Sequence, residues 1–147
     1  MRHYRHEFEV NAPLNKVAEF HSRTSALNLL TPPPMVVKFN YMEPLSEGSR
    51  SDFTLWFGPI PIRWVAIHSE VDPSKGFTDT QVEGPFQVWV HQHTFQSISE
   101  HKTRIIDEIQ AQVSAHFFWG MISRFMWLTL PVLFSYRASQ TRKAISG

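Results

Sequence analysis

Six stretches with the alternation of β-strands, followed directly by one long apolar helical stretch, restrict the possible folds of this chain most strongly. The strand-like stretches lie between Met35 and Val113, and the helical one runs from His116 to about Lys143. Side chains alternate between the two faces of a strand, so such strands form a sheet whose apolar face needs a cover. The helical stretch is long and apolar enough to supply that cover. The pattern predicts an α+β fold in which a sheet packs on a C-terminal helix.

The first quarter of the chain adds one strand and two short helices. His3–Val10 alternates as a strand does, and Asn11-Ala-Pro13 precedes apolar residues at helical spacing. A second short helix is predicted over Ser25–Leu30, because the prolines of Thr31-Pro-Pro-Pro34 end it. This order of elements predicts a curved antiparallel sheet wrapped around the long C-terminal helix. At 147 residues, one domain spanning 1–147 is expected.

Two properties of the long helix can be predicted from its sequence: whether it lies in a membrane or in a protein core, and whether it is straight. Phe117–Phe134 contains a single charge, Arg124, so a membrane span has to be weighed. A span takes about 20 apolar residues, whereas this run is shorter and contains Pro131. We therefore predict a core helix without stable membrane insertion, bent near Trp127 because Pro131 removes a backbone hydrogen bond. Its apolar stripe is expected to pack on the sheet through Phe118, Ile122, Phe125, Met126 and Leu133.

Composition argues against several classes of function. Fourteen Lys and Arg against thirteen Asp and Glu leave the net charge near zero without a basic cluster, so no nucleic-acid partner is expected. The absence of cysteine excludes disulfides, thiolate metal sites and cysteine nucleophiles. The sequence contains no phosphate loop, dinucleotide fingerprint or nucleophile elbow, and no cofactor is predicted. The first ten residues do not resemble a signal peptide, so a cytoplasmic location is expected.

The stretch Gly76–Phe95 carries the clearest functional signal. It is predicted to form two strands, Phe77–Glu83 and Phe86–Gln96, joined by a turn at Gly84-Pro85. A plain structural hairpin separates an apolar face from a polar one. Here polar and aromatic side chains alternate onto the same face, which is typical of the wall of a ligand pocket. These mixed faces consist of Phe77, Asp79 and Gln81 on the first strand and Trp89, His91, His93 and Phe95 on the second.

Two histidines of this hairpin are candidates for chemistry. Because they are two residues apart on one strand, His91 and His93 point to the same side and could supply two metal ligands. A third ligand would have to come from Asp79, Asp107 or His68. Nothing in the sequence forces that convergence, and a pair of hydrogen-bonded histidines is the commoner outcome. No metal site is therefore predicted.

Asp107 is a further candidate, because it lies on the otherwise apolar face of the predicted strand Thr103–Val113. An ionised carboxylate in such a place is costly unless it is paired. A histidine of the neighbouring strand or Arg63 is the expected partner. One interpretation is a buried structural ion pair. The other is a carboxylate that orients an imidazole for general acid–base catalysis.

The dipeptide Arg63-Trp64 places a charged donor beside a large aromatic side chain. Alternation alone does not decide which of the two points inward. The candidate catalytic residues are His91, His93 and Asp107. The candidate ligand-binding residues are Arg63, Trp64, Asp79, Gln81, Trp89, His91, His93, Phe95 and Asp107.

Short motifs along nearly the whole chain match one superfamily. They are Val10-Asn-Ala-Pro13, Leu30-Thr-Pro-Pro-Pro34, Glu47-Gly-Ser49, Gly58-Pro-Ile-Pro-Ile-Arg-Trp64, Phe77-Thr-Asp-Thr-Gln81, Gly84-Pro-Phe86, Trp89-Val-His-Gln-His-Thr-Phe95, Asp107 and Phe134-Ser-Tyr-Arg137. On these motifs the chain resembles the START-like (SRPBCC) superfamily, in its polyketide cyclase/dehydrase branch. The segment Ser114–Phe118 departs from the pattern, since a loop with proline or glycine is usual there.

The resemblance implies a helix-grip (START/Bet v 1-like) fold with a deep cavity between the sheet and the long helix. It implies an apolar or amphipathic small molecule, lipid-like or polyketide-like, as the partner. Fold alone does not settle function, so two classes stay open. The first is a carrier or binding module, and the second is a cyclase or dehydratase that moves protons with His91, His93 and Asp107. Interaction at a membrane surface or in a homodimer, through Trp119–Phe134, is a further option.

Overall fold

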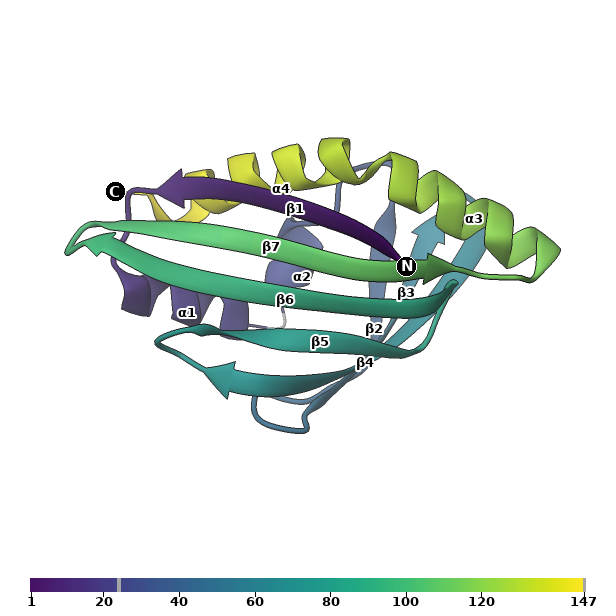
Figure 1. The fold of residues 1–147 in the computed structure, drawn as a ribbon, viewed down its shortest axis with the longest axis horizontal. Helices are drawn as coiled ribbons and strands as arrows, with labels where there is room; N and C mark the ends of the chain where they lie inside the picture. Colours follow the sequence, from purple (N-terminus) through teal and green to yellow (C-terminus); the bar gives the residue numbers. More distant parts are fainter. Residues whose placement is uncertain (24, 147) are drawn as a thin grey trace.

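A seven-stranded antiparallel sheet is the framework of the protein (Figure 1). The computed structural model describes residues 1–23 and 25–146. Across the sheet the strands follow the order β1-β7-β6-β5-β4-β3-β2. The strands are β1 (Arg2–Val10), β2 (Val36–Met42), β3 (Arg50–Phe57), β4 (Ile60–Asp72), β5 (Gly76–Glu83), β6 (Phe86–Ser99) and β7 (Lys102–Val113). The helices are α1 (Leu14–Ser22), α2 (Ala26–Leu29), α3 (Phe117–Leu128) and α4 (Leu130–Ile145).

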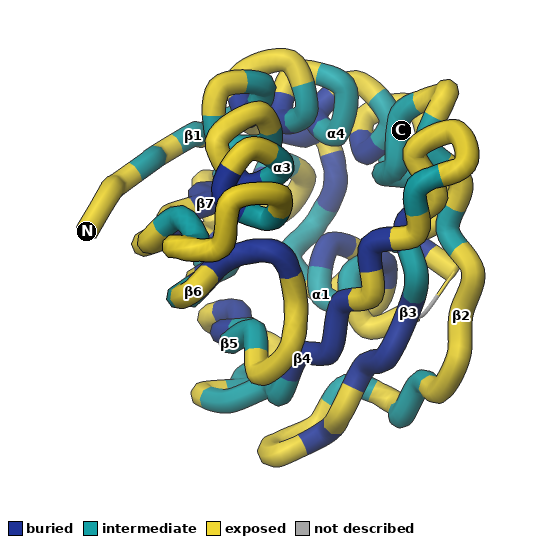
Figure 2. Tube along the Cα trace, turned by 90° about the vertical axis from the view of Figure 1, so that its right-hand side faces the viewer, coloured by how far each residue is buried: buried dark blue, intermediate teal, exposed yellow. Residues whose placement is uncertain are grey.

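The strand order follows from the connections. From β2 to β7 each strand pairs with the next one along the chain, as short turns favour. β1 pairs with β7 instead, because α1 and α2 separate it from β2. Figure 2 shows the sheet curling around α1, with α3 and α4 along one side of the curve. The predicted α+β fold, with two short helices after the first strand, is confirmed.

Two apolar clusters fill the concave side of the sheet. The larger one lies against α4, where Leu130 and Phe134 are almost fully buried over β3, β4, β6 and β7. The smaller one lies against α1, where Val17 packs with residues of β1, β6 and β7. Burying apolar surface contributes about 25 cal/mol per Å², so both helices are held by their inward faces. Side chains of both clusters, Trp64 from the first and Phe77 from the second, border the cavity between them.

The predicted long C-terminal helical region is present, and its bend divides it into two helices. α3 and α4 meet at Thr129 with an angle of 54° between them. Pro131 lies in the first turn of α4, where its missing N–H leaves no bond unmade. The Thr129 hydroxyl donates to the carbonyl oxygens of Phe125 and Met126, at 3.0 Å each, and so satisfies the end of α3. The bend predicted near Trp127 is confirmed.

The face that α3 turns to the sheet differs from the predicted apolar stripe. Phe118 and Phe125 are exposed, to 39% and 54%, whereas Ile122, Met126 and Leu133 pack on the larger cluster. The residues of α3 that are fully buried are small, Gly120 and Ser123. A β-carbon at Gly120 would lie 2.8 Å from the carbonyl oxygen of Ser114, so only glycine allows this approach. Close backbone packing, rather than side-chain size, therefore sets which face of α3 is inward.

The segment that departs from the superfamily pattern forms the start of α3. His116 caps the helix, because its Nδ1 accepts a hydrogen bond from the Trp119 amide at 3.4 Å. Ser123 reaches back to the same segment and accepts from the Ser114 amide at 3.2 Å. Side-chain caps of this kind satisfy the free amides at a helix start. In the described part of the chain, no individual helix has the length and hydropathy for a membrane span, and only the bent α3–α4 pair meets both criteria together.

Candidate functional site

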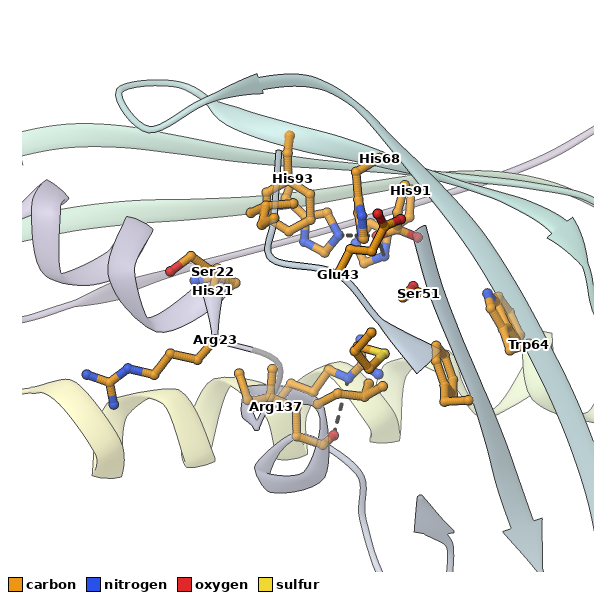
Figure 3. A pocket seen from close by; sticks show the side chains of 18 residues that line it. His21, Ser22, Arg23, Glu43, Ser51, Trp64, His68, His91, His93 and Arg137 are labelled. Atoms are coloured by element: carbon orange, nitrogen blue, oxygen red, sulfur yellow. Dashed lines mark hydrogen bonds and ion pairs between the residues drawn. The ribbon is translucent and has the colours of Figure 1, made fainter. Parts of the chain in front are cut away.

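A cavity of about 170 Å³ lies between the sheet, the α1–α2 region and α4 (Figure 3). Its walls mix aromatic and aliphatic side chains with several titratable groups. Exposed Ser22 and Arg23 mark its mouth. The apolar walls include Ala26, Leu27, Leu30, Phe53, Trp64 and Phe77, and the titratable ones are His21, Arg23, Glu43, His68, Asp79, His91, His93 and Arg137.

The register of three neighbouring strands gathers the polar side chains at one place. Asp79 of β5 lies opposite His91 of β6, and His93 of β6 lies opposite Asp107 of β7. Because residues two apart on a strand share a face, all four side chains point to the concave side. Gly76, at the start of β5, makes this register possible, since a β-carbon there would overlap the carbonyl oxygen of His93. We refer to Asp79, His91, His93 and Asp107 as the His–Asp cluster.

Short hydrogen bonds connect the members of the His–Asp cluster. His91 donates from Nε2 to Asp107 at 2.8 Å, and His93 donates from Nε2 to Asp79 at 2.6 Å. Nδ1 of His93 also lies 3.4 Å from Asp107 Oδ1. The two imidazole rings stack with their centroids 3.7 Å apart, and Phe77 stacks on the other face of His93 at 4.1 Å. Two stacked imidazoles are thus held between two carboxylates.

The charges within the cluster are set by these contacts. Burial opposes a proton on His93, but the hydrogen bonds and charges of Asp107 and Asp79 outweigh burial and raise the pKa of His93 to about 9. Burial and the charge of His93 lower the pKa of His91. Burial opposes ionisation of Asp79, but the hydrogen bond from His93 and the charges of both histidines hold the pKa of Asp79 at about 2. At neutral pH the cluster therefore contains two carboxylates, one imidazolium and one neutral imidazole.

We expect the histidines of this site to titrate far apart. His93 should titrate near pH 9, whereas burial lowers the pKa of His21, whose ring centre lies 6.4 Å from that of His93, to about 4. Because the pKa of His93 is raised from 6.5 on folding, its contribution of roughly 3 kcal/mol is complete below pH 6.5 and is lost as the pH rises through about 9. NMR titration of the imidazole nitrogens measures both values. A His93 that titrates near 6.5 would contradict the cluster as described.

Of the predicted ligand-binding residues, four line the cavity. They are Trp64, Asp79, His91 and His93. Asp107 lies behind the histidines and acts on the cavity through them. Of the partners left open for Asp107, the structure contains the histidine, His91, rather than Arg63.

The remaining predicted residues lie elsewhere. Arg63 is on the outer face of the sheet, with its side chain 53% exposed and paired with Asp52 at 2.8 Å. Gln81 closes the β5–β6 turn through bonds to the amide and carbonyl of Phe86. Trp89 packs in the core against Trp64. Phe95 packs in the smaller cluster and not on the cavity. The inward member of Arg63-Trp64 is thus the tryptophan.

Several residues of the cavity wall were not among the predicted ligand-binding residues, and His21, His68 and Arg137 are three of them; the sequence raised His68 only as a possible third metal ligand. His21 of α1 contacts Phe95, with ring centroids 4.9 Å apart, and its Nδ1 lies 2.9 Å from the Val17 carbonyl oxygen. His68 of β4 bonds to the Ser49 hydroxyl at 2.9 Å. Arg137 of α4 completes the set. The spacing of Phe134 and Arg137, one helical turn apart, is the signal that could have located Arg137.

The donor atoms of Asp79, His91 and His93 lie within 4.8 Å of one another, a spacing that a metal ion could bridge. Of the third ligands considered from the sequence, the structure places Asp79 beside the two histidines. In the structure Nε2 of His93 and the Asp79 carboxylate bond to each other instead. The absence of a metal site stays a prediction, and metal analysis of the purified protein checks it.

A wider groove of about 610 Å³ lies at the β4–β5 turn, and Phe77 and His93 border it as well as the cavity. Most of its other lining residues are polar, and Glu47, Glu70, Lys75, Gln92 and Gln96 are exposed. The smaller cavity contains most of the buried titratable groups, so it is the better candidate for a functional site.

No protein-family model matches the sequence, and neither does any curated protein. Solved structures do match over nearly the whole chain. A protein from Chromobacterium violaceum shares 12% identity with a TM-score of 0.77, covering 99% of this chain and 97% of that one. The chain has the helix-grip fold. This agrees with the START-like (SRPBCC) resemblance of its motifs.

Two other helix-grip proteins of this comparison are enzymes. The Zhui aromatase/cyclase from Streptomyces sp. R1128 is 16% identical with a TM-score of 0.69, covering 97% of this chain and 90% of that one. Norcoclaurine synthase from Thalictrum flavum, in complex with dopamine and hydroxybenzaldehyde, is 17% identical with a TM-score of 0.67, covering 97% and 85%. At such identities the likeness concerns the helix-grip fold alone.

Proposed function

We propose that this protein binds a small amphipathic molecule in the cavity between the sheet and α4. The observation that supports this most is the His–Asp cluster, a set of buried polar groups on the wall of an otherwise largely apolar cavity. Ligand sites are mostly apolar with a few placed polar groups. The apolar walls would hold the body of the ligand. His93 and Asp79, which face the cavity, would hold a hydroxyl or carbonyl group.

The volume of the cavity limits the size of the ligand. An engineered apolar cavity of about 150 Å³ binds benzene, and this one measures about 170 Å³. Drug-sized ligands occupy pockets of about 300–1,000 Å³. We therefore propose a ligand, or a ligand end, of the size of one ring or a short chain. The dopamine and hydroxybenzaldehyde bound by the structurally similar norcoclaurine synthase are molecules of this size.

Replacing His93 with alanine is expected to weaken binding of such ligands about tenfold, because a hydrogen bond at the polar wall contributes about 1.4 kcal/mol. The probes are phenol and 4-hydroxybenzaldehyde, and the tryptophan fluorescence reports their binding since Trp64 lines the cavity. His101→Ala, in the exposed β6–β7 turn, is the control and should leave the affinity unchanged. Unchanged affinity in a folded His93→Ala protein would place the ligand elsewhere. Native mass spectrometry of gently purified protein looks for the natural ligand.

A second candidate function is proton transfer in a cyclase- or dehydratase-type reaction. The observation that favours it is the position of His93, which faces the cavity and retains its proton at neutral pH because Asp79 and Asp107 flank it. A general acid needs a pKa near or above the working pH and access to the reacting oxygen. In this function His93 is the acid, Asp107 and Asp79 hold its charge, and the neutral His91 orients Asp107. Turnover lost in His93→Gln, with binding retained within about tenfold, would separate an enzyme from a carrier.

A further inference from the structure

Arg137 lies on the α4 side of the cavity, across from the His–Asp cluster on the sheet side (Figure 3). It is only partly accessible, and its guanidinium carbon lies 5.5 Å from the centre of the Phe134 ring. A single side-chain hydrogen bond, from Nε to the Leu30 carbonyl oxygen at 3.3 Å, connects it to the described residues. That bond uses one of five N–H donors. The remaining donors of Arg137 are available to a molecule in the cavity.

No carboxylate of the described residues forms an ion pair with Arg137 within 4.0 Å. Apart from Glu43, the other charged groups of the cavity wall each have, among the described residues, a partner that carries or can carry the opposite charge. Asp79 and Asp107 bond to histidines, and Arg23 pairs with Glu19 at 2.6 Å. The exception is Glu43, whose carboxylate accepts from the Arg50 amide. Arg137 is the cation of the cavity wall that lacks a close anion.

Burying a guanidinium without an anion is unfavourable, and burial lowers the pKa of Arg137, while the charges of Asp107 and Asp79 counter this. Arginine nevertheless keeps its proton in proteins. A purely structural role for Arg137 would be to hold the end of α2 through Leu30. A neutral donor would suffice for that role. The positive charge of Arg137 and its remaining N–H donors indicate an anionic partner.

We propose that Arg137 binds the carboxylate of the ligand, so that the ligand is a single-ring or short-chain carboxylic acid. This inference rests on the proposed binding function of the cavity. The guanidinium fork matches a carboxylate with two parallel hydrogen bonds. The two carboxylates of the His–Asp cluster repel an anion from the sheet side, so the acid group points to α4. A hydroxyl or carbonyl at the opposite end of the ligand then faces His93 and Asp79.

The test compares benzoate with benzamide, which has nearly the same shape without the charge, in isothermal titrations of the full chain. Wild-type protein should bind benzoate at least tenfold more tightly than benzamide. Arg137→Gln should weaken benzoate about 10- to 100-fold and remove the preference, because a hydrogen bond to a charged group is lost. The matched control is Arg142→Gln. Arg142 is also on α4, bonds a carbonyl oxygen and lies over the Phe8 ring, but outside the cavity.

Further variants separate this inference from its alternatives. Arg137→Lys should retain a weakened preference for benzoate, and Arg23→Gln should retain it fully. Equal binding of benzoate and benzamide to wild-type protein, or a preference that persists in Arg137→Gln, overturns the inference and leaves the proposed binding function standing. Loss of the preference in Arg23→Gln also overturns it, since the anion would then be held at the mouth. Binding of neither probe overturns the proposed function itself. Thermal unfolding of each variant establishes that it is folded.

Discussion

Phe134→Ala is expected to lower the free energy of unfolding by about 3–5 kcal/mol. Phe134 is 1% exposed and is the largest fully buried side chain. Its ring contacts those of Tyr4, His6 and His91, with centroids 5.5 to 5.7 Å apart. Truncation leaves a cavity between α4 and the sheet, because the surrounding strands relax only in part. Urea denaturation of both proteins measures the difference.

The matched control for this prediction is Phe125→Ala in α3. Phe125 is of the same residue type and belongs to the same apolar stripe of the sequence, but its side chain is 54% exposed. Its ring contacts that of Phe57, with centroids 6.0 Å apart. We expect a change of about 0.5 kcal/mol, typical of a surface position. Equal losses from the two substitutions would show that α3 is gripped by the sheet as firmly as α4, contrary to the structure.

Asp107→Asn is expected to destabilise the protein by about 1.5–3 kcal/mol at pH 6, because it removes the charged acceptor of His91 and one of the two counterions of the buried, protonated His93. The substitution retains the shape of the side chain and removes its charge. The loss should be clearly smaller at pH 10, since His93, with a pKa of about 9, has then released its proton. Chemical denaturation at the two pH values measures both quantities.

Glu9→Gln provides the comparison for a surface charge. Glu9 pairs with Lys102 at 3.7 Å and Arg104 at 3.3 Å, and all three side chains are at least 40% exposed. Such pairs contribute about 0–1 kcal/mol, and this one should show little difference between pH 6 and pH 10. If Asp107→Asn lowers the free energy of unfolding equally at both pH values, the hydrogen bond of Asp107 to His91 stabilises the protein. The attraction between the Asp107 carboxylate and protonated His93 then does not.

Phe134 connects the stability of the protein with the geometry of the cavity. Phe134 of α4 packs edge-on against His91, and Arg137 lies one turn further along the helix. The contact of Phe134 with His91 therefore joins α4 to a residue of the cavity wall. Loosening it by truncating Phe134 would change the distance between Arg137 and the His–Asp cluster. Stability and ligand binding are expected to change together at this position.

Much of the fold could be predicted from the sequence, because it depends on local periodicity. The alternation in β4 to β7 and the turns at Gly58-Pro59 and Gly84-Pro85 are properties of neighbouring residues. The bend near Trp127 follows from the chemistry of Pro131 alone. The shared face of His91 and His93 within β6 likewise follows from a period of two. These features needed no knowledge of what the segments pack against.

Tertiary structure decided the rest, because it depends on which surfaces meet. Arg63 and Trp64 could each have pointed inward, and a bulge between Val65 and Ala66 shows that strand register cannot be followed by alternation alone. On α3 the segment after β7 lies against Gly120 and Ser123, so the larger apolar residues of the predicted stripe are partly left in solvent. A hydrophobic pattern identifies apolar residues, but it cannot show where backbones approach closely. Arg137 is the clearest case. A charged residue in a helix is predicted to face solvent, and only the placement of α4 against the cavity turns its guanidinium toward the His–Asp cluster.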